Sequence, residues 1–206
     1  MEELIHKGKN ILFFDIETVG FPRRGEPIGI IEVGMQYVPN LGFSKDVTTI
    51  SQLYSFNGII PYEITKITGI TNEMVQNKPH ISEHFNLIQS LISESEVVVA
   101  HNAPFDIRCL ELAGFDFTGK EVFDTKTHAK RMFPKLSSHT MNSVCEYLGV
   151  NNKNAHRAIS DVNAMIKMYS RMTDLNKERE KLEYLIEKHK KLSYTKTKKL
   201  SKPLKS

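Results

Sequence analysis

The sequence predicts an α/β fold in which one mixed, five-stranded sheet is flanked by helices on both faces. Residues 11–14 form a continuous apolar run, which is typical of a strand buried on both faces. Three strand-like segments come first, and strand and helix patterns alternate after them. This order favours a layered fold in which helices on both sides cover the first strand.

The first three strands are expected to form an antiparallel meander with short connections. The second strand is predicted over 28–38 and the third over about 47–57. A short helix and a turn follow at 61–70, and Thr71 favours the start of another helix. Residues 80–93 carry apolar side chains at helical spacing.

The second half of the chain predicts the two remaining strands. Residues 97–100 are a short β-branched run, and Pro104 suits the first turn of a helix that Gly114 ends. Residues 121–125 fit a short strand. Further helices are expected near 126–133 and 139–148, and a last core helix after 157, with apolar residues on one stripe.

The composition indicates one domain of ordinary size. The chain has 206 residues, of which 40% are hydrophobic, and this is enough for one buried core. Its first residues lack the apolar run of a signal peptide, and no segment is long enough to span a bilayer. Cys109 and Cys145 match no metal-binding spacing and suit a reducing cytosol better than a disulfide framework. We therefore expect a soluble cytoplasmic protein.

Positive charge is concentrated near the C-terminus. Residues 174–206 contain eleven Lys or Arg and five Asp or Glu, whereas residues 1–173 contain 17 and 19. The charge predicts a main domain over 1–173 and a basic extension over 174–206, helical at first and then a disordered tail. The extension is interpreted as a solubilising tail, as a segment attracted to nucleic-acid phosphates, or as a docking segment for a protein partner.

Two carboxylates end the first strand. Asp15 and Glu17 are two positions apart, so they project to the same face of the strand. Burying two like charges together is unfavourable unless a positive charge lies between them. A divalent metal would supply that charge. The alternative is a strand end at which both acids are solvated.

Two further acids are expected near the same edge of the sheet. Asp106 lies in the first turn of the helix after residues 97–100, and Asp161 lies in the first turn of the last core helix. A single acid at such a place commonly complements the helix dipole. That explanation weakens when three elements each bring acid to a strand-to-helix junction, because sites form along this edge of α/β sheets.

Three segments match a known set of motifs in order and distance. They are Asp15-Ile16-Glu17, His101-Asn102-Ala103-Pro104-Phe105-Asp106 and Ala155-His156-Arg157-Ala158-Ile159-Ser160-Asp161. Together they resemble the three motifs of the DnaQ-like (DEDDh) 3′–5′ exonucleases, on an RNase H-like fold. His156 matches the histidine branch of that superfamily, since the other branch has Tyr where this chain has Arg157. The resemblance covers about residues 9–173.

The resemblance implies hydrolysis of phosphodiesters by a two-metal mechanism. Asp15, Glu17, Asp106 and Asp161 would bind two divalent ions, Mg²⁺ or Mn²⁺, with Asp15 bridging both. His156 would act as the general base for the attacking water, because an unperturbed histidine titrates near neutrality. Five helical residues rotate by about 140°, so we expect His156 on a loop before the helix.

The resemblance also implies contacts with the terminal nucleotide. Thr18 would lie beside it, and Phe21 would wedge against its base, although a loop hydrophobe covering the sheet edge explains Phe21 equally well. Gly69 and Ile70 resemble a turn that approaches the terminal sugar.

Three residues of the second motif are further candidates. His101 and Asn102 are expected to orient substrate or support the metal ligands. Phe105 would shape the nucleotide pocket, although its helical spacing with Cys109 favours a core position.

The motifs leave the substrate and the biological role open. Single-stranded 3′ ends of DNA, cut to nucleoside monophosphates, are the expected substrate. RNA or short oligonucleotides are the alternative, because no motif reports on the 2′-hydroxyl. A non-catalytic assembly subunit on this fold is another alternative, disfavoured by the gathered negative charge. A partner such as a polymerase would bind the C-terminal extension, and no membrane contact is expected.

Overall fold

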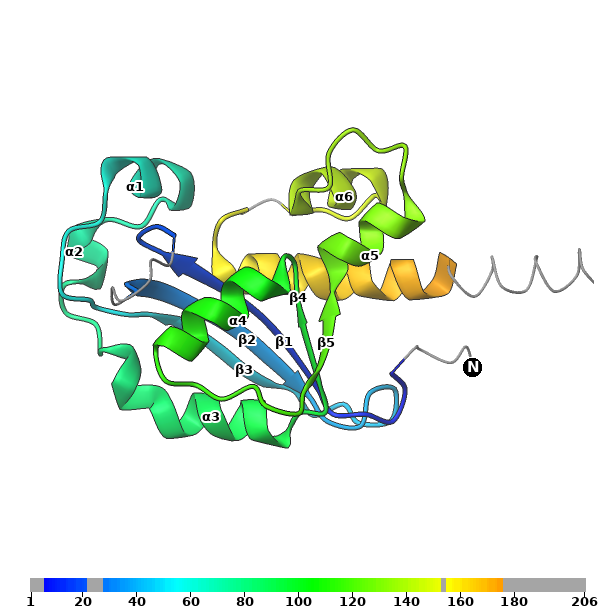
Figure 1. The fold of residues 1–206 in the computed structure, drawn as a ribbon, viewed down its shortest axis with the longest axis horizontal. Helices are drawn as coiled ribbons and strands as arrows, with labels where there is room; N and C mark the ends of the chain where they lie inside the picture. Colours follow the sequence, from blue (N-terminus) through cyan, green and yellow to red (C-terminus); the bar gives the residue numbers. More distant parts are fainter. Residues whose placement is uncertain (1–5, 22–27, 153–154, 176–206) are drawn as a thin grey trace, which may run out of the picture.

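The computed structural model describes residues 6–21, 28–152 and 155–175. One five-stranded sheet, in the order β3-β2-β1-β4-β5, forms its centre and confirms the predicted mixed α/β fold (Figure 1). The strands are β1 (Ile11–Thr18), β2 (Ile30–Val38), β3 (Thr48–Leu53), β4 (Val97–Ala100) and β5 (Glu121–Asp124). The helices are α1 (Tyr62–Thr68), α2 (Asn72–Val75), the 3₁₀ turn η1 (Ile81–His84), α3 (Phe85–Glu94), α4 (Ala103–Leu112), α5 (Thr125–Met132) and α6 (Met141–Tyr147), followed by helical residues 158–175.

The first strand lies at the centre of the sheet, as its apolar run predicts. β2 pairs antiparallel with β1, and β3 pairs antiparallel with β2, so the predicted meander is confirmed. β4 and β5 run parallel to β1 on its other side. The carboxyl ends of β1, β4 and β5 therefore meet at one edge of the sheet.

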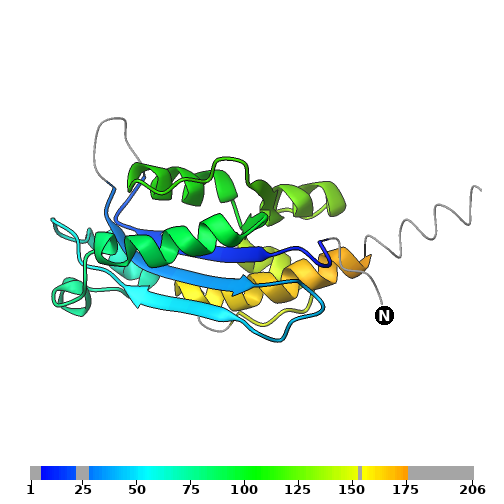
Figure 2. The ribbon, with the colours of Figure 1, turned by 90° about the horizontal axis from the view of Figure 1, so that it is seen from below.

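Helices cover both faces of the sheet (Figures 1 and 2). Leu12 and Phe14 pack in the layer that includes buried residues of α3 and α4. Ile11 and Phe13 pack on the opposite face, with residues of α6 and of helix 158–175. Because side chains alternate along a strand, the acids of β1 share the face of Ile11 and Phe13 and point toward helix 158–175.

A small lobe formed by α1 and α2 lies near the carboxyl end of β1 (Figure 1). It packs on Ile31 of β2 through Ile60, Ile70 and Val75. The Thr71 hydroxyl accepts a hydrogen bond from the backbone N–H of Met74 and caps α2, as its position in the sequence predicts.

The two cysteines are free, as predicted, and both are buried. Cys109 packs in the layer of α3 and α4, and Cys145 packs in the opposite layer. Burial raises the pKa of each thiol to about 11.

Some predicted strand boundaries are wrong, and the second strand begins at Ile30 rather than at 28. The third strand ends at Leu53 rather than near 57, because Ser55 leaves β2 and forms a parallel bridge with His80, while the ring of Tyr54 is buried. β5 ends at Asp124 because its carboxylate accepts from the N–H of Lys126 and caps α5, which leaves Thr125 to the helix.

The last described helix continues to residue 175, two residues beyond the predicted domain boundary. The rest of the predicted basic extension, 176–206, lies outside the described residues, so its helical part and its tail stay predictions. Within the described ranges, no helix has the length and apolar character needed to cross a membrane.

Candidate active site

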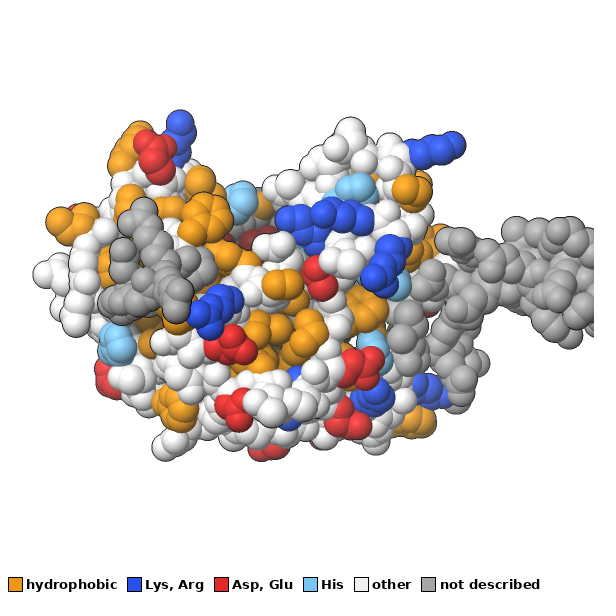
Figure 3. Space-filling view, viewed as in Figure 1, with side chains coloured by type: hydrophobic (Ala, Val, Ile, Leu, Met, Phe, Trp, Pro, Cys, Tyr) orange, Lys and Arg blue, Asp and Glu red, His pale blue; other side chains and the backbone are white. Residues whose placement is uncertain are grey.

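A cavity of about 240 Å³ opens at the carboxyl edge of the parallel strands. It is the hollow between α1 and α6 in Figure 3, with acidic atoms at its floor. All four predicted carboxylates and several other candidates line it: Asp15, Glu17, Asp106, Asp161, His156, His101, Asn102 and Phe105. The fold thus brings residues of three distant segments to one place.

The acids of β1 meet the last helix because β2 carries a glycine at the crossing. Gly34 lies opposite Asp15 in the β1–β2 ladder. A Cβ atom on Gly34 would lie 2.5 Å from the carbonyl carbon of Ala158, which is closer than real Cβ contacts come. The missing side chain lets the start of the helix approach the sheet, and Asp161 follows one turn later.

The charges of this cavity repel one another. Burial, and then the neighbouring Asp106 and Asp161, raise the pKa of Asp15 well above its usual value. Burial and the charge of Asp161 raise the pKa of Glu17 to about 8. Carboxylates under such repulsion are stabilised by a cation, and hard oxygen donors suit Mg²⁺ or Mn²⁺. The donor set therefore fits a divalent metal, and it does not fit acids that are merely solvated.

Asp106 is fixed by the turn from β4 into α4. Its buried carboxylate accepts a hydrogen bond from the backbone N–H of Ile16 at 3.3 Å, and burial raises its pKa. Asn102 has a left-handed backbone with φ of 83°. The carboxylate of Asp124, at the end of β5, accepts from the N–H of Asn102 at 2.8 Å. Asp124 therefore fixes the turn, a contribution that the sequence analysis missed.

Asp161 holds the turn that carries His156. Its carboxylate accepts hydrogen bonds from Asn152 Nδ2 at 2.6 Å and from the backbone N–H of His156 at 2.8 Å. Burial raises its pKa. His156 is exposed, with φ of 68°, in the turn before helix 158–175. The structure thus places His156 where the helix geometry predicts it.

One group of ligand atoms in the described part of the chain is tight enough to hold a single metal ion. Atoms of Glu17, His156 and Asp161 lie within 4.8 Å of one another. Asp15 and Asp106 line the same cavity outside this group. His156, the predicted general base, therefore lies as close to these two acids as a shared metal ligand would.

Glu32 is a buried residue that the sequence analysis did not single out. It lies opposite Glu17 in the β1–β2 ladder and is 1% exposed. The Arg157 guanidinium donates to its carboxylate at 2.9 Å, and the backbone N–H of Ala158 donates to it at 3.0 Å. This carboxylate ties both the turn of His156 and the first turn of the helix to β2.

The ring of His101 is engaged within the protein. Its Nδ1 is 3.0 Å from the Thr125 hydroxyl, and its Nε2 is 3.0 Å from the carbonyl oxygen of His139. Burial lowers the pKa of His101 to about 4, so the ring is neutral at working pH. His101 therefore links β4 to the segments after β5 on the wall of the cavity.

Phe21 contacts Phe105, which lines the cavity. Phe21 is 83% exposed, and its ring meets that of Phe105 edge-on, with centroids 5.9 Å apart. Phe105 lines the cavity and also packs against the core, and its contact with a nucleotide stays a prediction. Thr18 is buried, and its hydroxyl donates to the carbonyl oxygen of Gly20 at 2.7 Å.

Gly69 and Ile70 are not among the residues that line the cavity. Gly69 ends α1 with φ of 70°. The side chain of Ile70 is fully buried against Ile31 and Val75.

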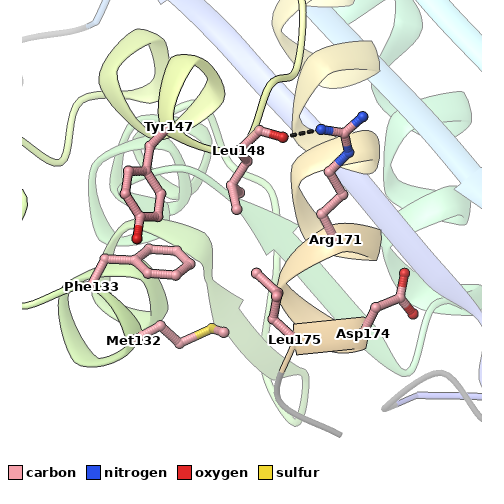
Figure 4. Close-up of a pocket in the computed structure, with 7 residues that line it drawn as sticks. All are labelled: Met132, Phe133, Tyr147, Leu148, Arg171, Asp174 and Leu175. Atoms are coloured by element: carbon pink, nitrogen blue, oxygen red, sulfur yellow. Dashed lines mark hydrogen bonds between the residues drawn. The ribbon is translucent and has the colours of Figure 1, made fainter. Parts of the chain in front are cut away.

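A second cavity, of about 590 Å³, lies beside α5, α6 and the end of the last described helix (Figure 4). Its walls are mostly apolar, and Arg171 donates to the carbonyl oxygen of Leu148 there. Its described lining contains one carboxylate, Asp174, so it lacks the convergent acids of the smaller cavity.

Comparison with known proteins decides the family. The model of the family RNase_T, described as Exonuclease, matches residues 12–169. The chain belongs to this exonuclease family. The match confirms the resemblance to DnaQ-like 3′–5′ exonucleases that the three motifs carry.

Named relatives of this exonuclease chain include DNA polymerase III proteins. A PolC-type DNA polymerase III of Clostridium perfringens is 36% identical over 155 residues, which cover 73% of this chain and 10% of the relative. A DNA polymerase III subunit epsilon of Treponema pallidum is 29% identical over 174 residues, covering 82% of this chain and 78% of the relative. The chain thus spans about a tenth of the PolC-type relative.

Solved exonucleases share the fold. Escherichia coli exonuclease I in complex with a dT13 oligonucleotide matches with a TM-score of 0.68 and 19% identity, over 86% of this chain and 43% of that one. Exonuclease X in complex with 5′ overhanging duplex DNA matches with a TM-score of 0.58 and 23% identity, over 80% and 98%. These matches confirm the RNase H-like fold.

Proposed function

We propose that this chain is a metal-dependent exonuclease that removes nucleoside monophosphates from 3′ ends of DNA. The observation that carries the proposal is the convergence of Asp15, Glu17, Asp106, Asp161 and His156 on one cavity. Raised carboxyl pKa values indicate that this cavity needs positive charge. The repulsion between these carboxylates lowers stability, and an assembly protein has no use for it. Catalysis is therefore favoured over an assembly role.

The four carboxylates would hold two divalent ions, Mg²⁺ or Mn²⁺. When bound, such ions activate water and stabilise the attacking and leaving oxygens of an in-line displacement. His156 would accept the proton of the attacking water, and its exposed place in a turn allows it to reach that water. Asp161 orients His156 through the backbone hydrogen bond between them.

The terminal nucleotide would lie between the β1 end and α4. Phe105, which lines the cavity, and Phe21, which contacts it, offer ring faces and edges that suit stacking on any base. Asn102 lines the cavity and is exposed, and its side-chain amide is a candidate donor to substrate. His101 and Thr18 would act by holding the neighbouring backbone. Gly69 and Ile70 would contribute only through the backbone of their turn.

DNA is favoured over RNA because relatives are DNA polymerase III proteins and solved structures with this fold hold DNA. The same relatives support association with a polymerase and a role in proofreading. A cytoplasmic location accords with such a role.

The test is single-turnover digestion of matched 5′-labelled DNA and RNA oligonucleotides with Mg²⁺. The wild-type protein should shorten DNA from its 3′ end, and Asp15→Asn should be slower by about 10³-fold or more, because several kcal/mol of metal stabilisation is lost. Equal ladders from the two proteins contradict the proposal. If RNA is digested faster than DNA, RNA is the substrate instead.

A further inference from the structure

A segment beside the cavity carries only positive charge. This basic lobe, residues 125–145, comprises α5, the following loop and the first part of α6. It contains Lys126, Lys130, Arg131 and Lys135 and no Asp or Glu. The other described residues contain ten Lys or Arg and 17 Asp or Glu. A polyanion that approaches the described surface is therefore attracted mainly to the basic lobe.

The basic lobe borders the carboxylates directly. Thr140, Met141 and Asn142, all within it, line the cavity. At its other end, Lys126 Nζ donates to the side-chain oxygen of Asn102, which also lines the cavity, at 3.4 Å. Figure 3 shows Lys and Arg side chains gathered over α5, beside the hollow that holds the acids.

Helix stability does not explain this charge. Lys130 and Arg131 lie in the last turn of α5, where cations complement the helix dipole. Lys126 lies in the first turn, where the dipole disfavours a cation, and Lys135 lies beyond the helix end. All four cations lie in the segment whose residues Thr140, Met141 and Asn142 line the cavity.

The cations are available to a ligand. Within the described part of the chain, none of the four forms an ion pair with a carboxylate. Lys130, Arg131 and Lys135 are exposed. Asp124, the acid that precedes the lobe, is engaged instead by the N–H of Asn102 and the hydroxyl of Thr127.

We propose that the basic lobe binds the backbone phosphates of the nucleic-acid strand on the 5′ side of the bond that is cut. The proposal rests on the function proposed above. The carboxylates of the cavity repel phosphates, so the attraction that delivers a strand must come from a neighbouring surface. Release of counterions from each neutralised phosphate supplies that attraction without regard to sequence.

The test compares two triple variants of the full chain. Lys130→Ala, Arg131→Ala and Lys135→Ala together remove the exposed charge of the basic lobe. Lys45→Ala, Lys78→Ala and Lys167→Ala together remove three exposed charges outside it. Binding of a fluorescent 12-nucleotide single strand is measured with Ca²⁺ between 50 and 200 mM salt. Hydrolysis of the p-nitrophenyl ester of thymidine 5′-monophosphate is measured with Mn²⁺, because this ester is too small to reach the lobe.

The lobe variant should bind the strand more weakly at low salt. Three lost phosphate contacts lower the salt slope by about 2, so the wild type should lose about 20-fold more affinity than the lobe variant across the salt range. The control variant should behave like the wild type, and all three proteins should hydrolyse the ester equally.

Equal salt slopes in both triple variants overturn the inference and leave the exonuclease proposal standing. Ester hydrolysis that falls together with strand binding also overturns it, since the lobe then acts on the catalytic cavity. If the wild type hydrolyses neither ester nor oligonucleotide, the proposed activity fails, and the binding comparison still decides what the lobe does.

Discussion

Asp15 and His156 face the same cavity from two different kinds of backbone. Asp15 projects from the central strand, where the β1–β2 ladder and a fully buried apolar run fix its direction. His156 is exposed in a turn with a left-handed φ of 68°. The difference separates two tasks: rigid strands and helix starts hold the carboxylates, and a turn held by a few polar contacts presents the proposed proton acceptor.

The contacts that hold the turn are therefore as important as the histidine itself. A non-glycine residue at positive φ costs on the order of 1 kcal/mol, so the surrounding structure must impose it. The Asp161 carboxylate and the pair of Glu32 with Arg157 supply this constraint. Changes to these groups should act mainly through His156, whereas changes to strand acids should act through the metal.

Among changes to the turn and its contacts, the largest effect should come from His156→Ala, although it should be smaller than that of Asp15→Asn. Loss of the proton acceptor should slow single-turnover cleavage by about 10²- to 10⁴-fold. The strand acids keep their geometry in this variant. The Mn²⁺ concentration at which the metal-induced rise in melting temperature is half complete should therefore not change. A shift of that midpoint would make His156 a ligand, as its nearness to Glu17 and Asp161 allows.

Glu32→Gln should have the next largest effect. It removes the charge that anchors Arg157 and should lower kcat by about 10- to 100-fold, the range for groups that support a metal site. In the His156→Ala background, Glu32→Gln should lower kcat much less, because the Glu32–Arg157 ion pair acts through the turn that carries His156. Full additivity in this cycle would contradict a positioning role for Glu32.

Phe21→Ala should have a smaller effect, confined to binding. Loss of one stacked base costs about 1–3 kcal/mol, so KM for an oligonucleotide should rise by about 10-fold with kcat unchanged. Phe43→Ala is the matched control, since Phe43 is also well exposed and lies in the β2–β3 connection. Equal KM values for the two variants would contradict stacking and favour the interpretation in which Phe21 only covers the sheet edge.

The smallest effect, of a few degrees, should appear in the melting temperature of the metal-free protein. The pKa of Glu17 is about 8 in the folded state and near 4.5 when unfolded, so the folded state holds this proton more tightly. Stability should therefore fall as pH rises from about 5 to 8 in EDTA. Glu17→Gln should flatten this slope, whereas Glu63→Gln, an exposed acid on α1, should not.

The sequence predicts the features that depend on local pattern. The apolar run before Asp15 identifies the central strand, and the period of two places Glu17 on the same face. The β-branched run of β4 matches its strand boundaries. Helix rotation places His156 before the last helix rather than on it.

Features that depend on contacts between distant segments are not visible in the sequence. Glu32 and Arg157 are 125 positions apart, and nothing near Glu32 indicates a buried ion pair. The need for Gly34 arises only once a helix start crosses β2 at that point. Asp124 resembles an ordinary helix cap until the β4–α4 turn donates to it.

The buried thiols make this chain a convenient host for site-specific labels. Neither Cys109 nor Cys145 presents a reactive thiolate, because both are buried and burial raises their pKa values. A cysteine introduced at Lys135 would then be the preferred target of a maleimide dye. Energy transfer from that dye to a labelled strand would report on arrival and departure of substrate without removal of the native cysteines.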